Sequence, residues 1–376
     1  MANTMQCTLP VLMALLAVAL VHPSAAKTVC TLSAVAGVVL TGTCSTNGGA
    51  PTNITGAGSS GVLPGTTITY SVNANARASR FVCASNNDVL TFTASVWSDQ
   101  TFNICEPSLL EIVGCSGATV ANSTFTGITR NIAQPGGCAP SKYGPCIAVL
   151  GGNRQTGNWW FFSTSNTFTS VITDLSTTGV TRRGGAFALD RAESGGKMNV
   201  LVVGSTFTSV SCDSGGSISA TDADLTVRNS TCTSNLAVNG GCIHFQSLQK
   251  DFLDGILTYA IRKISLERST FTTGTANNQG GLVAVYRGNV SISGSTFTQG
   301  EAREGQCVWL NECADYTEDQ IVGNTWTECS TTFTTWCRAN NGNVWTSCGV
   351  EGPPQCSTQF PSPPSPSPSP SPPPLG

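Results

Sequence analysis

The chain alternates apolar and polar residues in short runs, and one such run returns many times. Examples are MNVLVVGSTF (198–207), KISLERSTF (263–271) and NVSISGSTF (289–297). Alternation with a period of two is typical of a half-buried β-strand. Glycine, asparagine and serine separate the runs and favour tight turns. The pattern therefore predicts many short strands and almost no helix.

One aromatic position, or its substitute, marks a repeat along the chain. It falls at Phe125, Phe168, Phe207, Cys232, Phe271, Phe297, Trp326 and Trp345. Three of the intervals are 25, 26 and 29 residues, and surface insertions into a unit of that size explain most of the longer ones. A glycine pair and another alternating strand follow several of the motifs, as in GGCIHF (240–245) and GGLVAV (280–285).

Three short strands in about 25 residues, with no hairpin turn between them, predict one coil of a right-handed parallel β-helix. We expect all-β coils stacked about 4.8 Å apart. The aromatic residues would form an internal ladder, the flanking threonines would point outward, and serine would share outward positions. The glycine pairs would occupy sharp corners without room for a Cβ atom. The short intervals argue against a β-propeller, and the regular aromatic argues against a β-sandwich.

The repeat divides the chain into segments. We expect a cap and first coils over residues 27–104, the regular repeats over 105–300, and Cys-rich last coils over 301–356. The best helical candidate is Leu248–Lys263, interpreted as a short amphipathic insertion on the outside. Residues 357–376 form a Pro/Ser-rich tail that favours extended polyproline II and cannot form a packed core.

Residues 1–26 have the features of a secretory signal peptide. The apolar run Leu9–Val21 is too short to span a bilayer, and Ser24 and Ala26 suit a cleavage site after Ala26. No other segment is long and apolar enough for a transmembrane anchor. We therefore expect a secreted protein.

Cysteine usage agrees with secretion. Of 17 cysteines, Cys7 would leave with the signal peptide, and an even set of 16 is expected to form disulfides in an oxidising compartment. There is no CxxC pair, and the mature chain has one histidine, His244, so a zinc site is not expected. We expect no cofactor.

Charge is sparse, since only 10% of residues are charged and the formal net charge is −3. This gives no electrostatic footprint for nucleic acid and no basic patch for anionic lipid. Hydroxyls, amides or attached sugars must provide solubility. Four N-glycosylation sequons are predicted sites in a eukaryotic secretory pathway: Asn53, Asn122, Asn229 and Asn289.

The GG-hydrophobic corners and the STFT strand ends resemble the repeats of polymorphic outer-membrane proteins. That family combines a GGA[ILV] motif with an FxxN motif on right-handed β-helices of surface adhesins. GGCI (240–243) and GGAF (184–187) fit the first motif. The second is kept only as CTSN (232–235), because Phe207 is followed by Thr-Ser-Val. The resemblance covers about residues 122–310 and implies the fold more than the function.

The tail PSPPSPSPSPSPPP (361–374) resembles hydroxyproline-rich segments of plant and green-algal cell-wall proteins. The resemblance implies hydroxylated, O-glycosylated prolines and a place in the cell wall or extracellular matrix. The alternative is a plain linker.

Right-handed β-helices include pectin-degrading enzymes, so catalysis has to be weighed. Polygalacturonase-like enzymes carry a GHG histidine, which this chain lacks. Glycoside cleavage needs two positioned carboxylates, and the candidates are Asp190 with Glu193 and Asp222 with Asp224. A lyase needs carboxylates for calcium and a basic residue, for which Arg182-Arg183 near Asp190 is the one hint. Each of these reads more simply as a solvated turn, and His244 as a structural or surface residue, so no catalytic residue is assigned.

Adjacent tryptophans give a further candidate. Trp159 and Trp160 face opposite sides of one strand, and one of them is a possible sugar-stacking platform. The sequence thus favours a glycosylated cell-surface or cell-wall protein that acts by adhesion or as a structural scaffold. Its expected partners are cell-wall or matrix polysaccharides and glycoproteins. A polysaccharide-active, pectin-lyase-like enzyme is the second interpretation, and a non-catalytic carbohydrate-binding module is the third.

Overall fold

A computed structural model describes most of the chain between residues 28 and 348. The described residues are 28–35, 39–46, 52–57, 60–63, 68–73, 78–83, 88–103, 107–131, 141–151, 158–175, 181–191, 197–248, 250–253, 256–259, 262–313, 321–329, 335–338 and 345–348. The predicted signal peptide, the Pro/Ser-rich tail and Glu193 lie outside the described residues.

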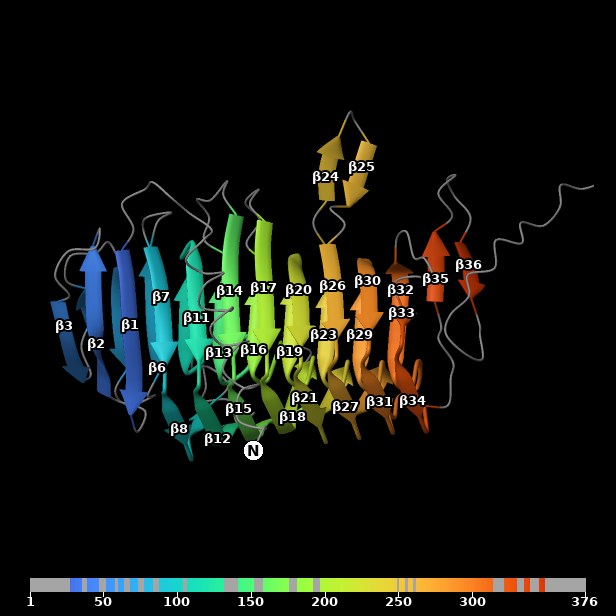
Figure 1. Cartoon of the computed structure of the whole chain (residues 1–376), viewed down its shortest axis with the longest axis horizontal. Helices are drawn as coiled ribbons and strands as arrows, with labels where there is room; N and C mark the ends of the chain where they lie inside the picture. The colour runs from blue at the N-terminus through green and yellow to red at the C-terminus, as the bar shows by residue number, and fades with distance from the viewer. Residues whose placement is uncertain are drawn as a thin grey trace, which may run out of the picture.

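Within these ranges every regular element is a β-strand, and the strands form three stacked families (Figure 1). The first family is β7(Asp88–Thr93), β11(Gly117–Ala121), β14(Asn158–Thr164), β17(Lys197–Val203), β20(Ala223–Arg228), β26(Arg262–Glu267), β30(Gly288–Ser293) and β33(Ile321–Val322). The second is β8(Val96–Ser98), β12(Thr124–Asn131), β15(Thr167–Thr173), β18(Thr206–Ser214), β21(Thr231–Thr233), β27(Thr270–Thr272), β31(Thr296–Thr298) and β34(Thr325–Thr327), with short continuations β9(Thr101–Asn103), β22(Leu236–Asn239) and β28(Thr275–Gln279). The third is β6(Ala78–Cys83), β10(Leu110–Val113), β13(Ile147–Leu150), β16(Phe187–Asp190), β19(Ile218–Thr221), β23(Ile243–Gln246), β29(Val283–Tyr286), β32(Val308–Cys313) and β35(Thr335–Arg338).

Within each family, successive main strands pair in parallel with one another. Val200 is opposite Leu225, Phe168 is opposite Phe207, and Ile218 is opposite Ile243. One strand from each family therefore makes a coil, and equivalent residues of successive coils lie above one another. The prediction of an all-β chain of parallel strands is confirmed, and the arrangement is compatible with a β-helix.

Antiparallel strands stand at both ends of the stack. The first group, β1(Thr28–Val35), β2(Val39–Thr46) and β3(Thr52–Ala57), reaches the parallel stack through β1 and β7. β4(Ser60–Val62) and β5(Ile68–Asn73) pair antiparallel with each other and with β6. At the other end, β36(Trp345–Cys348) pairs antiparallel with β35. Trp345 is thus outside the aromatic column in which the repeat had placed it, and that part of the prediction is wrong.

The predicted helix at Leu248–Lys263 is also wrong. The segment contains an antiparallel hairpin of β24(Lys250–Leu253) and β25(Ile256–Tyr259), and β26 begins at Arg262. In the sequence, Asp-Gly separates these two strands, and that dipeptide is typical of β-hairpins. In Figure 1 the hairpin projects from the body of the stack.

The core between the three families is mainly apolar, as predicted, and it also contains the buried side chains of Arg130 and Arg182. Phe125, Phe168, Phe207, Phe271 and Phe297 are all buried. At the glycine-pair corners, a Cβ atom on Gly216 would lie 2.1 Å from the carbonyl oxygen of Gly241, and one on Gly241 would lie 2.0 Å from that of Gly281. Backbone therefore occupies the space that any side chain would need, which confirms the interpretation of these glycines.

Four disulfides are present among the described residues: Cys30–Cys44, Cys83–Cys115, Cys232–Cys242 and Cys307–Cys329. Cys146 and Cys212 are free and buried, so the expectation that all mature cysteines pair is wrong for these two. They belong to coils two steps apart, a separation of about 10 Å along the stack that a disulfide cannot bridge. Burial raises the pKa of both thiols, that of Cys212 to about 12, which keeps them protonated.

Candidate functional site

The most regular surface of the molecule is built from threonine. Seven successive strands of the second family, β12, β15, β18, β21, β27, β31 and β34, each carry a threonine on either side of one inward residue. We call this surface the threonine face, and it consists of Thr124, Thr126, Thr167, Thr169, Thr206, Thr208, Thr231, Thr233, Thr270, Thr272, Thr296, Thr298, Thr325 and Thr327. All are half-buried or exposed, as predicted for outward positions. The register sets them in two parallel columns.

A column of aromatic side chains packs directly behind the threonine face, on the inner side of the same strands. It starts with Trp97 and continues through the buried phenylalanines to Trp326. The rings of Trp97 and Phe125 stack with centroids 4.6 Å apart, and those of Phe297 and Trp326 with centroids 4.4 Å apart. Interplanar angles near 10° make this a continuous stack within each stretch of aromatic residues. The predicted internal ladder is confirmed for this column.

Turns at both ends of each threonine strand fix its position along the coil. The residue two places before the first threonine has a positive φ in all seven coils: Asn122, Ser165, Gly204, Asn229, Arg268, Gly294 and Gly323. The residue after the second threonine also has a positive φ in all seven: Gly127, Ser170, Ser209, Ser234, Thr273, Gln299 and Glu328. Each strand is therefore confined between two left-handed corners of the same kind, so the columns stay in register.

A hydrogen-bonded ladder inside the first corner links the coils. Its members are the residues before the first threonine: Ser123, Asn166, Ser205, Ser230, Ser269, Ser295 and Asn324. The backbone N–H of each donates to the side-chain oxygen of the next, for example Ser123 to Asn166 at 2.8 Å and Ser269 to Ser295 at 3.1 Å. The five serines are buried, so the expectation that the serine of this motif points outward is wrong. Counted back from Phe207, strand alternation places Ser205 inward, which agrees with its burial.

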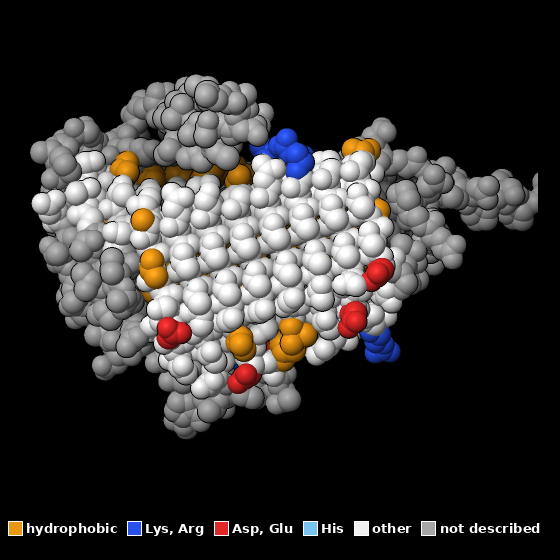
Figure 2. All heavy atoms as spheres, turned by 60° about the horizontal axis from the view of Figure 1, so that its bottom comes forward, with side chains coloured by type: hydrophobic (Ala, Val, Ile, Leu, Met, Phe, Trp, Pro, Cys, Tyr) orange, Lys and Arg blue, Asp and Glu red, His pale blue; other side chains and the backbone are white. Residues whose placement is uncertain are grey.

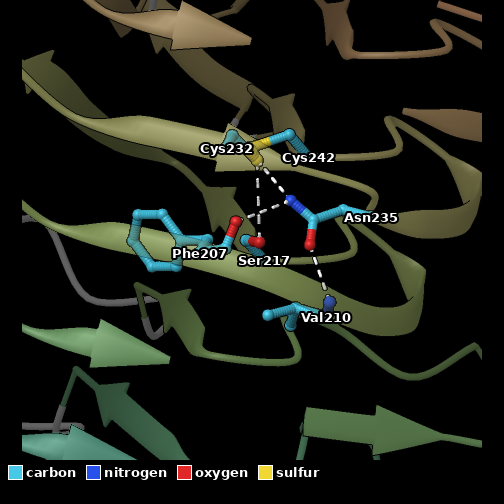
Figure 3. The surroundings of a disulfide bond; sticks show 6 residues. All are labelled: Phe207, Val210, Ser217, Cys232, Asn235 and Cys242. Carbon is cyan, nitrogen blue, oxygen red and sulfur yellow. Dashed lines mark hydrogen bonds between the residues drawn. A yellow bond between two sulfur atoms is a disulfide. The ribbon is translucent and has the colours of Figure 1, made fainter. Parts of the chain in front are cut away.

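Cys232 replaces the aromatic residue in one coil. Figure 3 shows its disulfide to Cys242, which precedes β23 of the third family, so the bond crosses the interior. The Asn235 amide donates to Cys232 Sγ at 2.6 Å, and its oxygen accepts from the Val210 backbone N–H at 2.7 Å. This coil therefore replaces ring stacking with a covalent link, and Thr231 and Thr233 keep their places in the columns.

The threonine face is chemically uniform. None of its fourteen hydroxyl groups has a hydrogen-bond partner among the described residues. Neither column contains a charged or aromatic side chain. In Figure 2 the middle of this side of the molecule is white, the colour of the backbone and of side chains that are neither hydrophobic nor charged, while most coloured groups lie toward its edges. A ligand of the two columns would meet threonine side chains at fixed intervals, and the charged residues Arg268 and Glu328 stand at the bordering corners.

A second group of polar side chains lies on the outer side of the third family. Asp190 Oδ2 is 3.2 Å from Arg183 Nη1, 3.6 Å from Lys142 Nζ and 3.4 Å from the Tyr143 hydroxyl. We call these four residues the flank cluster. Burial raises the pKa of Tyr143, and the hydrogen bond with Tyr143 raises that of Lys142. The cluster holds one carboxylate, already neutralised by two cations.

His244 lies beside this cluster on β23, with Ser219 and Ala284 opposite it in the neighbouring coils. The residue is half-buried, and its Nδ1 atom is fully buried without a hydrogen-bond partner. Burial, assisted by the positive charge of Arg183, lowers the pKa of His244 to about 4. The ring is therefore neutral near pH 7.

Asp222 and Asp224 have partners of their own outside the flank cluster. Asp222 occupies a corner with positive φ, where its Oδ1 accepts from the Leu248 backbone N–H. Asp224 accepts from the Lys263 backbone N–H at 2.8 Å and pairs with Lys197 Nζ at 2.6 Å. No group of three His, Cys, Asp or Glu side chains that could hold a metal ion occurs in the described part of the chain. Asp222 and Asp224 thus act in a corner and in an ion pair.

Arg182 and Arg183 point to different environments. Arg183 joins the flank cluster, whereas Arg182 is fully buried and its Nε lies 3.3 Å from Asp213 Oδ2. Arg130 is buried nearby and donates to the backbone oxygens of Tyr143 and Pro107 at 2.6 and 2.8 Å. Burial, with the charge of Arg182, contributes to lowering the pKa of Arg130 to about 10. Only Arg183 of the predicted basic pair is thus placed near Asp190.

The two tryptophans face opposite sides of β14. Trp159 is buried, and Trp160 is half-buried on the outer side, where its indole lies over Gly117 so closely that a Cβ there would be 2.2 Å from Trp160 Cε2. Trp160 is therefore the less buried residue of the pair. It belongs to the first family and not to the threonine face.

The four sequon asparagines occupy different settings. Asn53 on β3 is exposed, and Asn289 on β30 is half-buried. Asn122 and Asn229 are exposed at first corners of the threonine face, two residues before Thr124 and Thr231. Glycans at these two positions would project from an edge of the face.

Among the described residues no helix is long and apolar enough to cross a membrane. Comparisons of the chain with protein-family models, with curated proteins and with solved structures find no match.

Proposed function

We propose that the protein is a secreted right-handed parallel β-helix that acts by contact, as an adhesion or scaffold protein of the cell surface, cell wall or extracellular matrix. Right-handedness is the expected sense because parallel crossover connections are right-handed in nearly all known cases. The disulfides favour an oxidising compartment. The predicted signal peptide, glycans and proline-rich tail belong to the same proposal.

The threonine face carries this proposal. Seven coils present the same pair of threonines between fixed corners at both ends; stacked rings hold six of them on the inner side, and a disulfide links the seventh. A rigid surface loses little conformational freedom on binding, so even weak individual contacts add up. Matrix polysaccharides and glycoproteins are the partners that the predicted secretion and cell-wall-type tail favour, and the threonine face is the surface that would contact a solid partner.

Retention of the full chain on insoluble polymers tests the proposal. The protein is incubated with crystalline cellulose, chitin, cell-wall material and matrix glycoproteins, and the bound fraction is measured. Thr233→Tyr inserts a bulky side chain into the middle of the face, whereas Thr226→Tyr makes the same change on the outer side of β20 in the same coil. We expect the first variant to lose retention and the second to keep it. Equal retention of both would contradict a role for the face.

The flank cluster is the observation that favours a polysaccharide-active enzyme. It sets a tyrosine with raised pKa beside a lysine, an arginine and an aspartate. A glycoside hydrolase needs a second carboxylate, which this cluster does not contain. Incubation with pectin and alginate, followed by assays for new reducing or unsaturated ends, tests whether the protein cleaves polysaccharides. Turnover that Asp190→Asn and Tyr143→Phe abolish would replace the contact function by catalysis.

Trp160 is the observation that favours a non-catalytic carbohydrate-binding module, because it is the less buried residue of the pair and an indole can stack on a sugar ring. In that case Trp160→Ala, and not Thr233→Tyr, would reduce the retention on polysaccharide.

A further inference from the structure

We propose that the ordered partner of the threonine face is ice. This inference rests on the proposed contact function and names the solid with which the face makes contact. It starts from the geometry of the two threonine columns.

The columns define a rectangular lattice. Neighbouring coils place equivalent threonines about 4.8 Å apart, and the two threonines of one strand, separated by one residue, lie about 6.7 Å apart. Hexagonal ice also has two perpendicular repeat distances of this order, along its a and c axes, with the shorter one close to the spacing between neighbouring coils. The match holds in two perpendicular directions and over seven coils.

The side chain in the lattice suits ordered water. Threonine is β-branched, so its hydroxyl and methyl groups have few positions relative to a strand. The fourteen hydroxyls have no intramolecular partner within the described residues and remain available to hydrogen-bond water. Each threonine also carries a methyl group, which adds apolar surface to the face. The face therefore favours a water layer with the spacing of the columns, which a growing ice crystal can incorporate.

The uniformity of the face separates ice from the other candidate partners. Protein interfaces depend on aromatic and arginine hot spots, and sugars stack on aromatic rings. The columns contain neither kind of residue, and they lack the cations that bind nucleic acid. A surface made of one side chain in both directions matches a partner whose own repeating unit is one small molecule. Ice has this property, whereas polysaccharide chains present several different groups in each repeat.

Many weak contacts are sufficient for a solid partner. Each threonine contributes little, but a rigid array engages an ice plane at all coils together. The columns extend for about 29 Å, taken as six intervals of about 4.8 Å. Dissociation would require most of these contacts to break at once, so a bound molecule would stay on the crystal and restrict growth around it.

The experiment uses the purified full chain and pure ice. Thermal hysteresis, inhibition of ice recrystallisation and uptake into a slowly growing ice hemisphere are measured for the wild type, Thr233→Tyr, Thr208→Tyr and the matched control Thr226→Tyr. Circular dichroism and thermal unfolding establish that each variant is folded. We expect the wild type and Thr226→Tyr to enter the ice and shape its crystals. The two face variants should lose activity by about tenfold or more, because simultaneous engagement of the columns is blocked.

The possible failures are distinguishable. A folded wild type that is excluded from ice and gives no hysteresis would overturn this inference. If that protein is still retained on a solid polysaccharide, and Thr233→Tyr abolishes the retention, the contact function stands and only its partner changes. Retention on neither solid would count against both. Ice activity that is unchanged in both face variants would also refute the assignment to this surface.

Discussion

The phenyl ring of Phe271 stacks on that of Phe297 in the next coil, with centroids 4.9 Å apart and planes 10° from parallel. Both rings are buried, and the strands that carry them pair in register. Thr270 and Thr272 flank the first ring, and Thr296 and Thr298 flank the second. The same strands therefore stack aromatic rings on their inner side and align threonines on their outer side.

Truncation of one ring should destabilise the stack. Phe271→Ala leaves a cavity between neighbouring coils, and we expect a loss of about 3–5 kcal/mol in the free energy of unfolding. Denaturant unfolding followed by circular dichroism measures it. Thr272→Ala on the same strand is the control, with an expected change within about 0.5 kcal/mol because its side chain points outward. Similar effects for the two variants would contradict the inward assignment of Phe271.

The hydroxyl ladder gives a second prediction. Ser269 Oγ accepts from the Ser230 backbone N–H at 3.2 Å. Ser269→Ala leaves this buried donor without a partner and should cost about 1–3 kcal/mol. Ser269→Asn restores a side-chain oxygen of the kind that Asn166 supplies in an earlier coil, and it should recover much of the loss. If the asparagine variant is the less stable of the two, acceptance of the hydrogen bond is not the reason for the serine.

The strand pattern was readable from the sequence because a period of two leaves little freedom. Once Phe207 is inward, Thr206 and Thr208 must be outward, and the recurrence of STFT implies stacking. The same alternation places Ser205 inward, whereas the general preference of serine for the protein surface predicts the opposite. A preference for one residue type is a weaker guide than strand geometry.

Other features could not be derived in this way. The segment Leu248–Lys263 has an amphipathic composition that fits a helix as well as a hairpin, and only its Asp-Gly dipeptide favoured the turn. An even number of cysteines does not show which of them meet, so the isolation of Cys146 and Cys212 depended on the spacing of coils. The cations that contact Asp190 come from two different coils, Lys142 from one and Arg183 from the next. No local sequence pattern predicts such contacts between coils.

The Cys232–Cys242 disulfide should contribute measurably to stability. It closes a short loop, with a sequence separation of 10, and replaces the stacked ring of one coil. We expect Cys232→Ala to lower the free energy of unfolding by about 2–4 kcal/mol. The double variant Cys232→Ala/Cys242→Ala should lose little more, since the bond is already absent in the single variant. Fully additive losses for Cys232→Ala and Cys242→Ala would contradict this account.

His244 should make the fold sensitive to acid. Its pKa is about 4 in the folded chain, below the ordinary value of 6.5, because the ring is desolvated beside the charge of Arg183. Between these two values the unfolded chain binds the proton more tightly, so protonation favours unfolding. The contribution of His244 to stability is complete above about pH 6.5 and declines as the pH falls toward about 4. Thermal unfolding of the wild type and of His244→Gln from pH 7 to pH 4 tests this. The variant, which lacks the titrating ring, should lose less stability over that range, by about 1–3 kcal/mol. Parallel pH profiles for the two proteins would show that His244 does not titrate with a depressed pKa.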